Sequence, residues 1–122
     1  MVVPHGELSA AVALFRSLAE PTRLAIMRRL ASGEARVVDL TVELGLAQST
    51  VSSHLACLRG CGLVDYRPQG RASVYHLARP ELMELLQAAE TLLAATGEAV
   101  ALCPNYGIDA SRDASRDAGG RS

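Results

Sequence analysis

The stretch from residue 37 to residue 62 restricts the fold of this chain more than any other part of the sequence. Within it, "VVDLTVELGL" predicts a short helix from Val37 to Leu44 that ends at Gly45, because glycine commonly terminates helices. "QSTVSSHLACLRGCG" then predicts a second helix that ends at Gly62. The apolar residues of this second helix that recur at helical spacing, and so face inward, are Val51, Leu55 and Leu58. Two helices joined by a short turn containing glycine are typical of a helix-turn-helix.

The segments on either side of this helix pair define the rest of the fold. A helix over residues 7–19 precedes it, as does another that starts at Pro21, where the missing N–H of proline costs no hydrogen bond. After the pair, "LVDYRPQGRASVYHL" predicts a β-hairpin around "PQGRA", and a long amphipathic helix begins at Pro80. The order α-α-α-α-β-β-α predicts a winged helix-turn-helix, a mainly α fold with a β-hairpin wing (α+β).

Length and composition favour one small globular domain. The chain has 122 residues, of which 49% are hydrophobic and 20% charged. No apolar run approaches the roughly 20 residues of a membrane span, and "MVVPHGELSA" lacks the pattern of a signal peptide. We therefore expect a cytoplasmic protein whose three cysteines are reduced. The repeat "DASRDASRDAGGRS" cannot bury enough apolar surface to fold, so we expect a domain over residues 1–103 and a flexible tail over residues 104–122.

The second helix of a winged helix-turn-helix lies in the DNA major groove and presents its first residues to the bases. Short polar side chains, which hydrogen-bond to phosphates and base edges, occupy that position here, and the hairpin adds two arginines. The predicted residues for binding double-stranded DNA are Gln48, Ser49, Thr50, Ser52, Ser53, His54, Arg67 and Arg71. A helix-turn-helix used only for packing, as in some enzymes, is the alternative interpretation. We predict no enzyme, since the sequence shows no nucleophile with a base partner, no glycine-rich phosphate loop and no plausible pair of catalytic carboxylates.

Three segments, "LAEPTRLAIMRRL", "LGLAQSTVSSHLACLRGCGLV" and "GRASVYHL", resemble the ArsR/SmtB family of metal-responsive bacterial repressors. The resemblance extends from residue 8 to about residue 100. It implies a homodimer that pairs through the first and last helices and binds a palindromic operator. One departure is Ala47, at a position where the family often has a serine that caps the DNA-reading helix. Its loss forgoes a cap worth about 1 kcal/mol, so we expect the start of this helix to fray without DNA.

The cysteines distinguish among the metal sites of the family. A Cys-x-Cys site at the start of the third helix is absent, because "EARVVDL" contains no cysteine, and the last helix has no histidine for a zinc site. What remains resembles the cadmium/lead sensors of the CmtR type within this family. That resemblance implies a site of three thiolates, Cys57, Cys61 and Cys103, with Cys103 supplied by the opposite protomer. It implies Cd(II) or Pb(II) as the inducer. A shell of three thiolates also suits As(III), Zn(II) is a further alternative, and His5, near the N-terminus, is a candidate fourth ligand.

The spacing of the cysteine pair agrees with this chemistry. Residues four apart on a helix have Cβ atoms about 5–6 Å apart, close enough for Cys57 and Cys61 to share one thiophilic ion. A third thiolate must come from elsewhere, and Cys103 is the remaining cysteine. On this hypothesis the metal-free dimer represses its operator, and metal releases the DNA and derepresses efflux or detoxification genes. Two alternatives stay open: the cysteines pack as small apolar residues in the core, or they make the protein a thiol-redox repressor.

Overall fold

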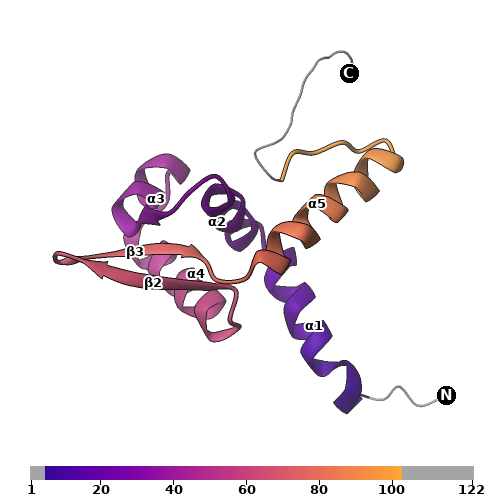
Figure 1. The fold of residues 1–122 in the computed structure, drawn as a ribbon, viewed down its shortest axis with the longest axis horizontal. Helices are drawn as coiled ribbons and strands as arrows, with labels where there is room; N and C mark the ends of the chain where they lie inside the picture. The colour runs from indigo at the N-terminus through magenta and orange to yellow at the C-terminus, as the bar shows by residue number, and fades with distance from the viewer. Residues whose placement is uncertain (1–4, 103–122) are drawn as a thin grey trace. The chain divides into compact units, whose positions relative to one another are not determined.

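The computed structural model describes residues 5–102, which form two compact units divided between Arg79 and Pro80. The first unit contains an N-terminal helix, three further helices and a three-stranded sheet (Figure 1). Its elements are α1 (His5–Ala19), α2 (Pro21–Ala31), β1 (Ala35–Arg36), α3 (Val37–Leu44), α4 (Gln48–Gly60), β2 (Val64–Gln69) and β3 (Ala72–Leu77). The second unit contains α5 (Pro80–Ala95). The predicted winged helix-turn-helix is confirmed: α3 and α4 are the helix pair, and β2 and β3 form the wing.

Helix α2 begins where the sequence predicts. Pro21 is its first residue, and the carboxylate of Glu20 accepts the backbone N–H of Arg23 at 2.8 Å, which caps the helix. Its apolar face is buried in the core of the first unit, with Ile26, Met27 and Leu30 almost inaccessible to solvent. This helix therefore provides the base on which the helix pair and the sheet pack.

The turn between α3 and α4 depends on Gly45, whose φ of 68° lies in the left-handed region that favours glycine. Ala47 follows as the N-cap of α4 and makes no side-chain capping hydrogen bond, as the sequence predicts. The inward-facing residues of α4 are fully buried, as expected: Val51, Leu55 and Leu58. Three apolar anchors on one face hold this otherwise polar helix to the core.

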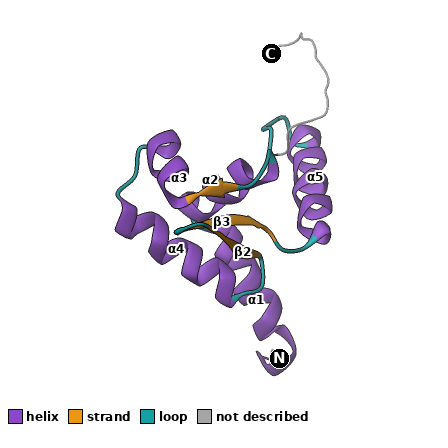
Figure 2. Ribbon diagram, turned by 60° about the vertical axis from the view of Figure 1, so that its left-hand side comes forward, coloured by secondary structure: helices purple, strands orange, loops and turns teal. Residues whose placement is uncertain are grey.

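The sheet contains a strand that the sequence analysis missed. Its order is β1-β3-β2, with all pairs antiparallel, so the element order is α-α-β-α-α-β-β-α rather than α-α-α-α-β-β-α. Strand β1 has only two residues, too few to show the alternation by which a strand is recognised. It pairs Arg36 with Val74 of β3, which ties the start of α3 to the wing. Figure 2 shows the strands lying between the helices of this unit, beside α4.

The N-terminal helix exposes an apolar face. Figure 1 shows α1 extending away from α3 and α4. Leu8, Val12 and Phe15 recur on one side of α1 and are exposed, Phe15 by 59%. An apolar stripe of this kind on a small domain marks a surface available for burial against another molecule.

The second unit begins at Pro80 and continues past the end of α5. The backbone N–H of Leu102 donates to the carboxylate of Glu90, which returns the chain toward the helix. No helix among residues 5–102 combines the length and apolarity that crossing a bilayer requires. The predicted tail, residues 104–122, and the predicted ligand Cys103 lie outside the described residues.

Candidate functional site

The start of α4 presents a polar surface. Gln48, Ser49, Ser52 and Ser53 are exposed, and Thr50 is half-buried. Because Ala47 leaves the first turn without a side-chain cap, the N–H groups of this turn are open to an external acceptor. These side chains are therefore accessible to a ligand, as the prediction of DNA contact requires.

His54 lies differently from the other predicted DNA-binding residues. It is half-buried, and its Nδ1 faces the start of α2, 3.5 Å from a guanidinium nitrogen of Arg23 and 3.8 Å from the carboxylate of Glu20. Arg23 also donates to the backbone carbonyl oxygens of Arg16 and Ser17 in α1. His54 thus connects the middle of α4 to the junction of α1 and α2, and its contact with DNA remains a prediction.

The wing carries the two predicted arginines on an exposed ribbon. Arg67 of β2 forms an ion pair with Glu34, and Arg71 is exposed immediately after Gly70, whose φ of 63° makes the turn. Arg71 and Gln48 line the same hollow, of about 290 Å³, between the start of α3, the start of α4 and the wing. The structure therefore brings one residue of the helix and one of the wing, both predicted from the sequence, to a common surface.

That hollow includes an arginine that the sequence analysis did not select. Arg36 lines it, and its guanidinium holds the carboxylate of Asp39 through two hydrogen bonds of 3.3 and 3.2 Å. This side-chain bond, together with the bond from the Arg36 backbone N–H, lowers the pKa of Asp39 below its usual value of 3.8. The sequence offers one signal for Arg36, its position directly before the helix-turn-helix. Its place in the hollow depends on β1, which the sequence does not predict.

The cysteine pair lies at the opposite end of α4. Cys57 and Cys61 are both free thiols and both exposed. Cys61 caps the helix, and its backbone N–H donates to the carbonyl oxygen of Cys57 at 3.1 Å. Exposure of both side chains within this chain argues against core packing as the reason for these cysteines.

One thiol of the pair has a polar neighbour on another helix. The Sγ atom of Cys61 lies 3.4 Å from the hydroxyl of Ser17, a buried polar residue of α1 that is only 4% exposed. Either atom can donate in this contact. The end of α4 is thereby linked to the helix that carries the exposed apolar face.

The described chain provides two of the three predicted metal ligands. Within residues 5–102 no three or more histidine, cysteine, aspartate or glutamate side chains gather to hold an ion. The side chain of His5 and the whole of Cys103 lie outside what is described. The donor chemistry of the exposed Cys57 and Cys61 fits a soft cation, and completion of the site requires a further ligand.

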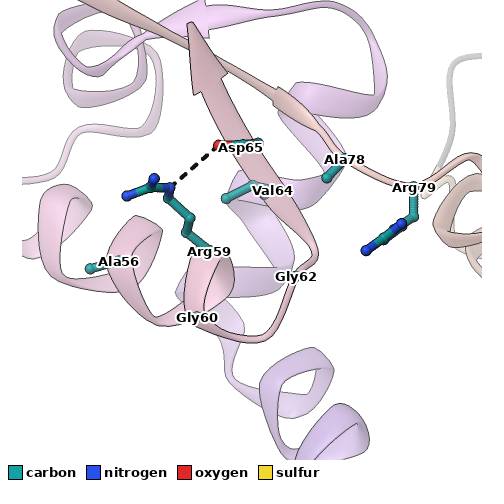
Figure 3. Close-up of a pocket in the computed structure, with 8 residues that line it drawn as sticks. All are labelled: Ala56, Arg59, Gly60, Gly62, Val64, Asp65, Ala78 and Arg79. Atoms are coloured by element: carbon teal, nitrogen blue, oxygen red, sulfur yellow. Dashed lines mark hydrogen bonds and ion pairs between the residues drawn. The ribbon is translucent and has the colours of Figure 1, made fainter.

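A second hollow lies beside the same end of α4. Its volume is about 490 Å³, and its lining includes Arg59 and Asp65, which form an ion pair at 3.3 Å (Figure 3). The guanidinium of Arg59 also stacks over the ring of Tyr66, 4.5 Å from its centre. The backbone N–H of Tyr66 is the main cause of a lowered pKa at Asp65. None of the residues that line this hollow is a cysteine, so it is separate from the thiol pair.

Two sequence relatives resemble the chain over most of its length. The HTH-type transcriptional regulator CmtR of Mycobacterium tuberculosis is 44% identical over 105 residues, which covers 75% of this chain and 89% of the relative. A probable mercury resistance operon repressor of Streptomyces lividans is 33% identical over 101 residues, covering 83% of this chain and 81% of the relative. Both descriptions are of transcriptional regulators, not of enzymes.

Solved structures agree in fold. The homodimeric winged helix-turn-helix domain of Mb0332 from Mycobacterium bovis has a TM-score of 0.70 and 25% identity, covering 80% of this chain and 92% of that one. The NMR structure of the cadmium metal-sensor CmtR from M. tuberculosis has a TM-score of 0.55 and 44% identity, covering 63% and 80%. Residues 20–66, from the cap of α2 into the wing, match the family described as bacterial regulatory protein, arsR family. The chain therefore belongs to the ArsR/SmtB family of winged helix-turn-helix transcriptional regulators.

Proposed function

We propose that this protein is a cytoplasmic, metal-responsive transcriptional repressor whose metal-free homodimer binds a palindromic operator and whose metal-bound form releases it. The observation that carries the proposal is the placement of an exposed cysteine pair on α4, the helix whose first residues are open to DNA. A ligand for the thiols and a ligand for the DNA-reading residues would thus act on one element.

DNA binding is supported by the surface at the start of α4. Its exposed glutamine and serines match the donors and acceptors of base edges in the major groove. The exposed Arg71 in the turn of the wing supplies positive charge beside it.

A homodimer is supported by the apolar face of α1 and by the homodimeric relative Mb0332. Leu8, Val12 and Phe15 would be buried against a second copy of the chain, with α5 contributing to the same interface. Two copies of α4 would then meet successive major-groove sites on one side of the DNA, which lie about 34–36 Å apart. Small changes in the orientation of either copy therefore weaken binding of both.

The inducer is a thiophilic cation held by Cys57, Cys61 and Cys103. The resemblance to a cadmium sensor favours Cd(II), with Pb(II) next and As(III) or Zn(II) as alternatives. When bound, such an ion supplies a fixed link among thiolates that are otherwise independent. Whether Cys103 comes from the same chain or from the partner, the link joins the end of α4 to a distant segment.

Coupling to DNA follows from what this end of α4 contacts. Cys61 touches Ser17 of α1, so recruitment of its thiol into a metal site would disturb the contact between α4 and the proposed dimer helix. Three thiols that become thiolates around a divalent ion also change the charge of each site by −1, which disfavours the approach of the negatively charged DNA. Both effects lower the affinity for DNA.

The test is a titration of fluorescent promoter DNA with the full-length protein, followed by anisotropy, with and without Cd(II). The promoter of the protein's own gene is compared with a scrambled sequence of equal length. We expect tight binding of the promoter by the metal-free protein and loss of that binding with Cd(II). Equal affinities in the two states would contradict the proposal, and release by peroxide without metal would favour the thiol-redox alternative.

The inducer is identified by a separate titration. Thiolate–metal charge-transfer absorption in the ultraviolet is followed as Cd(II), Pb(II), As(III) or Zn(II) is added at constant pH. We expect saturation at two ions per dimer for the physiological inducer, with release of protons from the thiols. An absence of thiolate absorption with every one of these ions would exclude the cysteine site.

A further inference from the structure

The hollow in front of α4 combines two positive side chains with the start of two helices. Arg36 comes from the junction of β1 and α3, Arg71 from the turn of the wing, and Gln48 from the first residue of α4. The other residues that line it are Val37, Val38, Ala72, Ser73 and Tyr75. Asp39 is the carboxylate that pairs with Arg36, so the arginine pair leaves one positive charge uncompensated among these groups.

The Arg36 guanidinium is oriented before any ligand arrives. Asp39 accepts two hydrogen bonds from the guanidinium and one of 3.0 Å from the Arg36 backbone N–H, so the carboxylate fixes both the backbone and the side chain. A guanidinium has five N–H donors, and two of them are used here. The side chain of Arg36 is 52% exposed, so its remaining donors can reach an anion outside the protein.

The short strand β1 sets the position of this arginine. Arg36 pairs with Val74 of β3, which places it one residue along that strand from Ser73 and close to the turn that bears Arg71. The hollow is therefore built by backbone pairing between the wing and the helix-turn-helix. A flexible side chain on an unpaired loop would not have this fixed relation to the wing.

We propose that this hollow holds a phosphate of the DNA backbone, with Arg36 as the principal contact, Arg71 as a second contact, and Asp39 as the positioning residue. This inference rests on the proposed function, because it adds a backbone contact to the groove contacts of α4. The fork of a guanidinium matches phosphate oxygens. Phosphate contacts fix the register of a protein on DNA, so Arg36 would set where the reading residues of α4 meet the bases.

The structure provides a close control for the test. Arg59 is 53% exposed and pairs with an aspartate, Asp65, as Arg36 does with Asp39, but it lies at the far end of α4. Arg36→Gln, Arg36→Lys and Arg59→Gln are compared with the wild type in the full-length chain. The affinities for operator DNA and for unrelated DNA are measured over a series of salt concentrations.

We expect Arg36→Gln to weaken binding of both DNA sequences several-fold. The slope of log K against log salt should fall by about 0.9 for each lost phosphate contact, close to 2 for a dimer. Arg36→Lys should keep most of the slope, because its charge remains, and Arg59→Gln should match the wild type. Thermal unfolding without DNA identifies any loss of stability at the start of α3, which would not change the slope.

An unchanged slope in Arg36→Gln, with the wild type binding its operator, would overturn the phosphate contact and leave the proposed function intact. A slope lowered equally in Arg59→Gln would also overturn it, because the effect would then reflect general charge. Failure of the wild type to bind any DNA would end both proposals. If Arg36→Gln does not fold, Arg36→Lys decides, because lysine keeps the charge but lacks the guanidinium fork. Weaker binding of both DNA sequences by Arg36→Lys supports the contact, and wild-type affinity contradicts it.

Discussion

The two ends of α4 differ in almost every property although one rigid helix of 13 residues, about 20 Å long, joins them. The first turn has no side-chain cap, carries glutamine and serines, and lies beside a hollow lined by arginines. The last turns carry two exposed thiols and contact α1 through Cys61. The difference shows how one helix could read DNA at one end and receive a chemical signal at the other.

The middle of α4 joins the two ends and would carry the proposed coupling between them. Val51, Leu55 and Leu58 are fully buried and hold the helix to the core as one body. His54 adds a polar link to Arg23 and Glu20 at the start of α2. In the proposed mechanism, a displacement at the thiol end would also move the first turn, since the helix has no break between them.

The largest effect is expected from removal of the shared anchor. Leu55→Ala leaves a cavity under the centre of α4 and should destabilise the protein by about 2–5 kcal/mol. It should impair DNA binding and metal binding together, as measured by chemical denaturation and by the two titrations. Loss of DNA binding or of metal binding alone, with the other fully retained, would show that the two ends of α4 do not both depend on its packing at Leu55.

Removal of a thiol should affect one end alone. Cys57→Ser replaces an exposed side chain, so the metal-free protein should keep its stability and its affinity for operator DNA. The release of DNA by Cd(II) should be abolished, because serine is a poor ligand for a soft cation. Cys103→Ser is expected to behave in the same way. If either variant still releases DNA at the metal concentration that suffices for the wild type, the substituted cysteine is not a ligand.

A side-chain cap introduced at the N-terminus of α4 should have a moderate effect on stability. Ala47→Ser supplies the missing side-chain oxygen and should stabilise the protein by about 1 kcal/mol. Metal affinity should stay as in the wild type, since the change lies at the opposite end of α4. Ala56→Ser, an exposed position within the same helix, is the control and should give no gain, because serine is a poorer helix former than alanine. Equal stabilisation by both would contradict a capping effect.

The smallest effect concerns pH. The pKa of Asp39 is lowered in the folded protein, so its ionised form contributes stability above the usual value of 3.8, and that contribution disappears as the pH falls through the lowered pKa. Asp39→Asn should therefore unfold at a lower temperature than the wild type near neutral pH, and the difference should shrink in acid. If the difference in unfolding temperature between Asp39→Asn and the wild type stays constant from neutral pH into acid, the charge of Asp39 does not contribute to stability.

The sequence predicts the helices and the wing because their signals are local. Pro21, Gly45 and the periodic Val51, Leu55 and Leu58 each specify a start, a turn or a buried face within a few residues. The sequence does not predict strand β1, since a two-residue strand is defined only by its partner in β3. The same long-range pairing explains why the sequence does not indicate a role for Arg36.

The cysteine site shows the same limit. Spacing alone places Cys57 and Cys61 on successive turns of one helix, and the structure shows that both are exposed. Their neighbour Ser17 is 44 residues away from Cys61 in the sequence, so no local pattern reveals the contact. The link between α1 and α4 emerges only from the fold, and it gives the thiols a route to the proposed dimer helix.

The most direct test of coupling between the ends of α4 is the affinity for Cd(II) with and without saturating operator DNA, followed by thiolate charge-transfer absorption. If metal weakens DNA binding by a given factor, thermodynamic linkage requires DNA to weaken metal binding by that same factor. We predict a lower Cd(II) affinity on the operator and no change with a scrambled sequence. Identical Cd(II) affinities for the free and operator-bound protein would contradict the coupling.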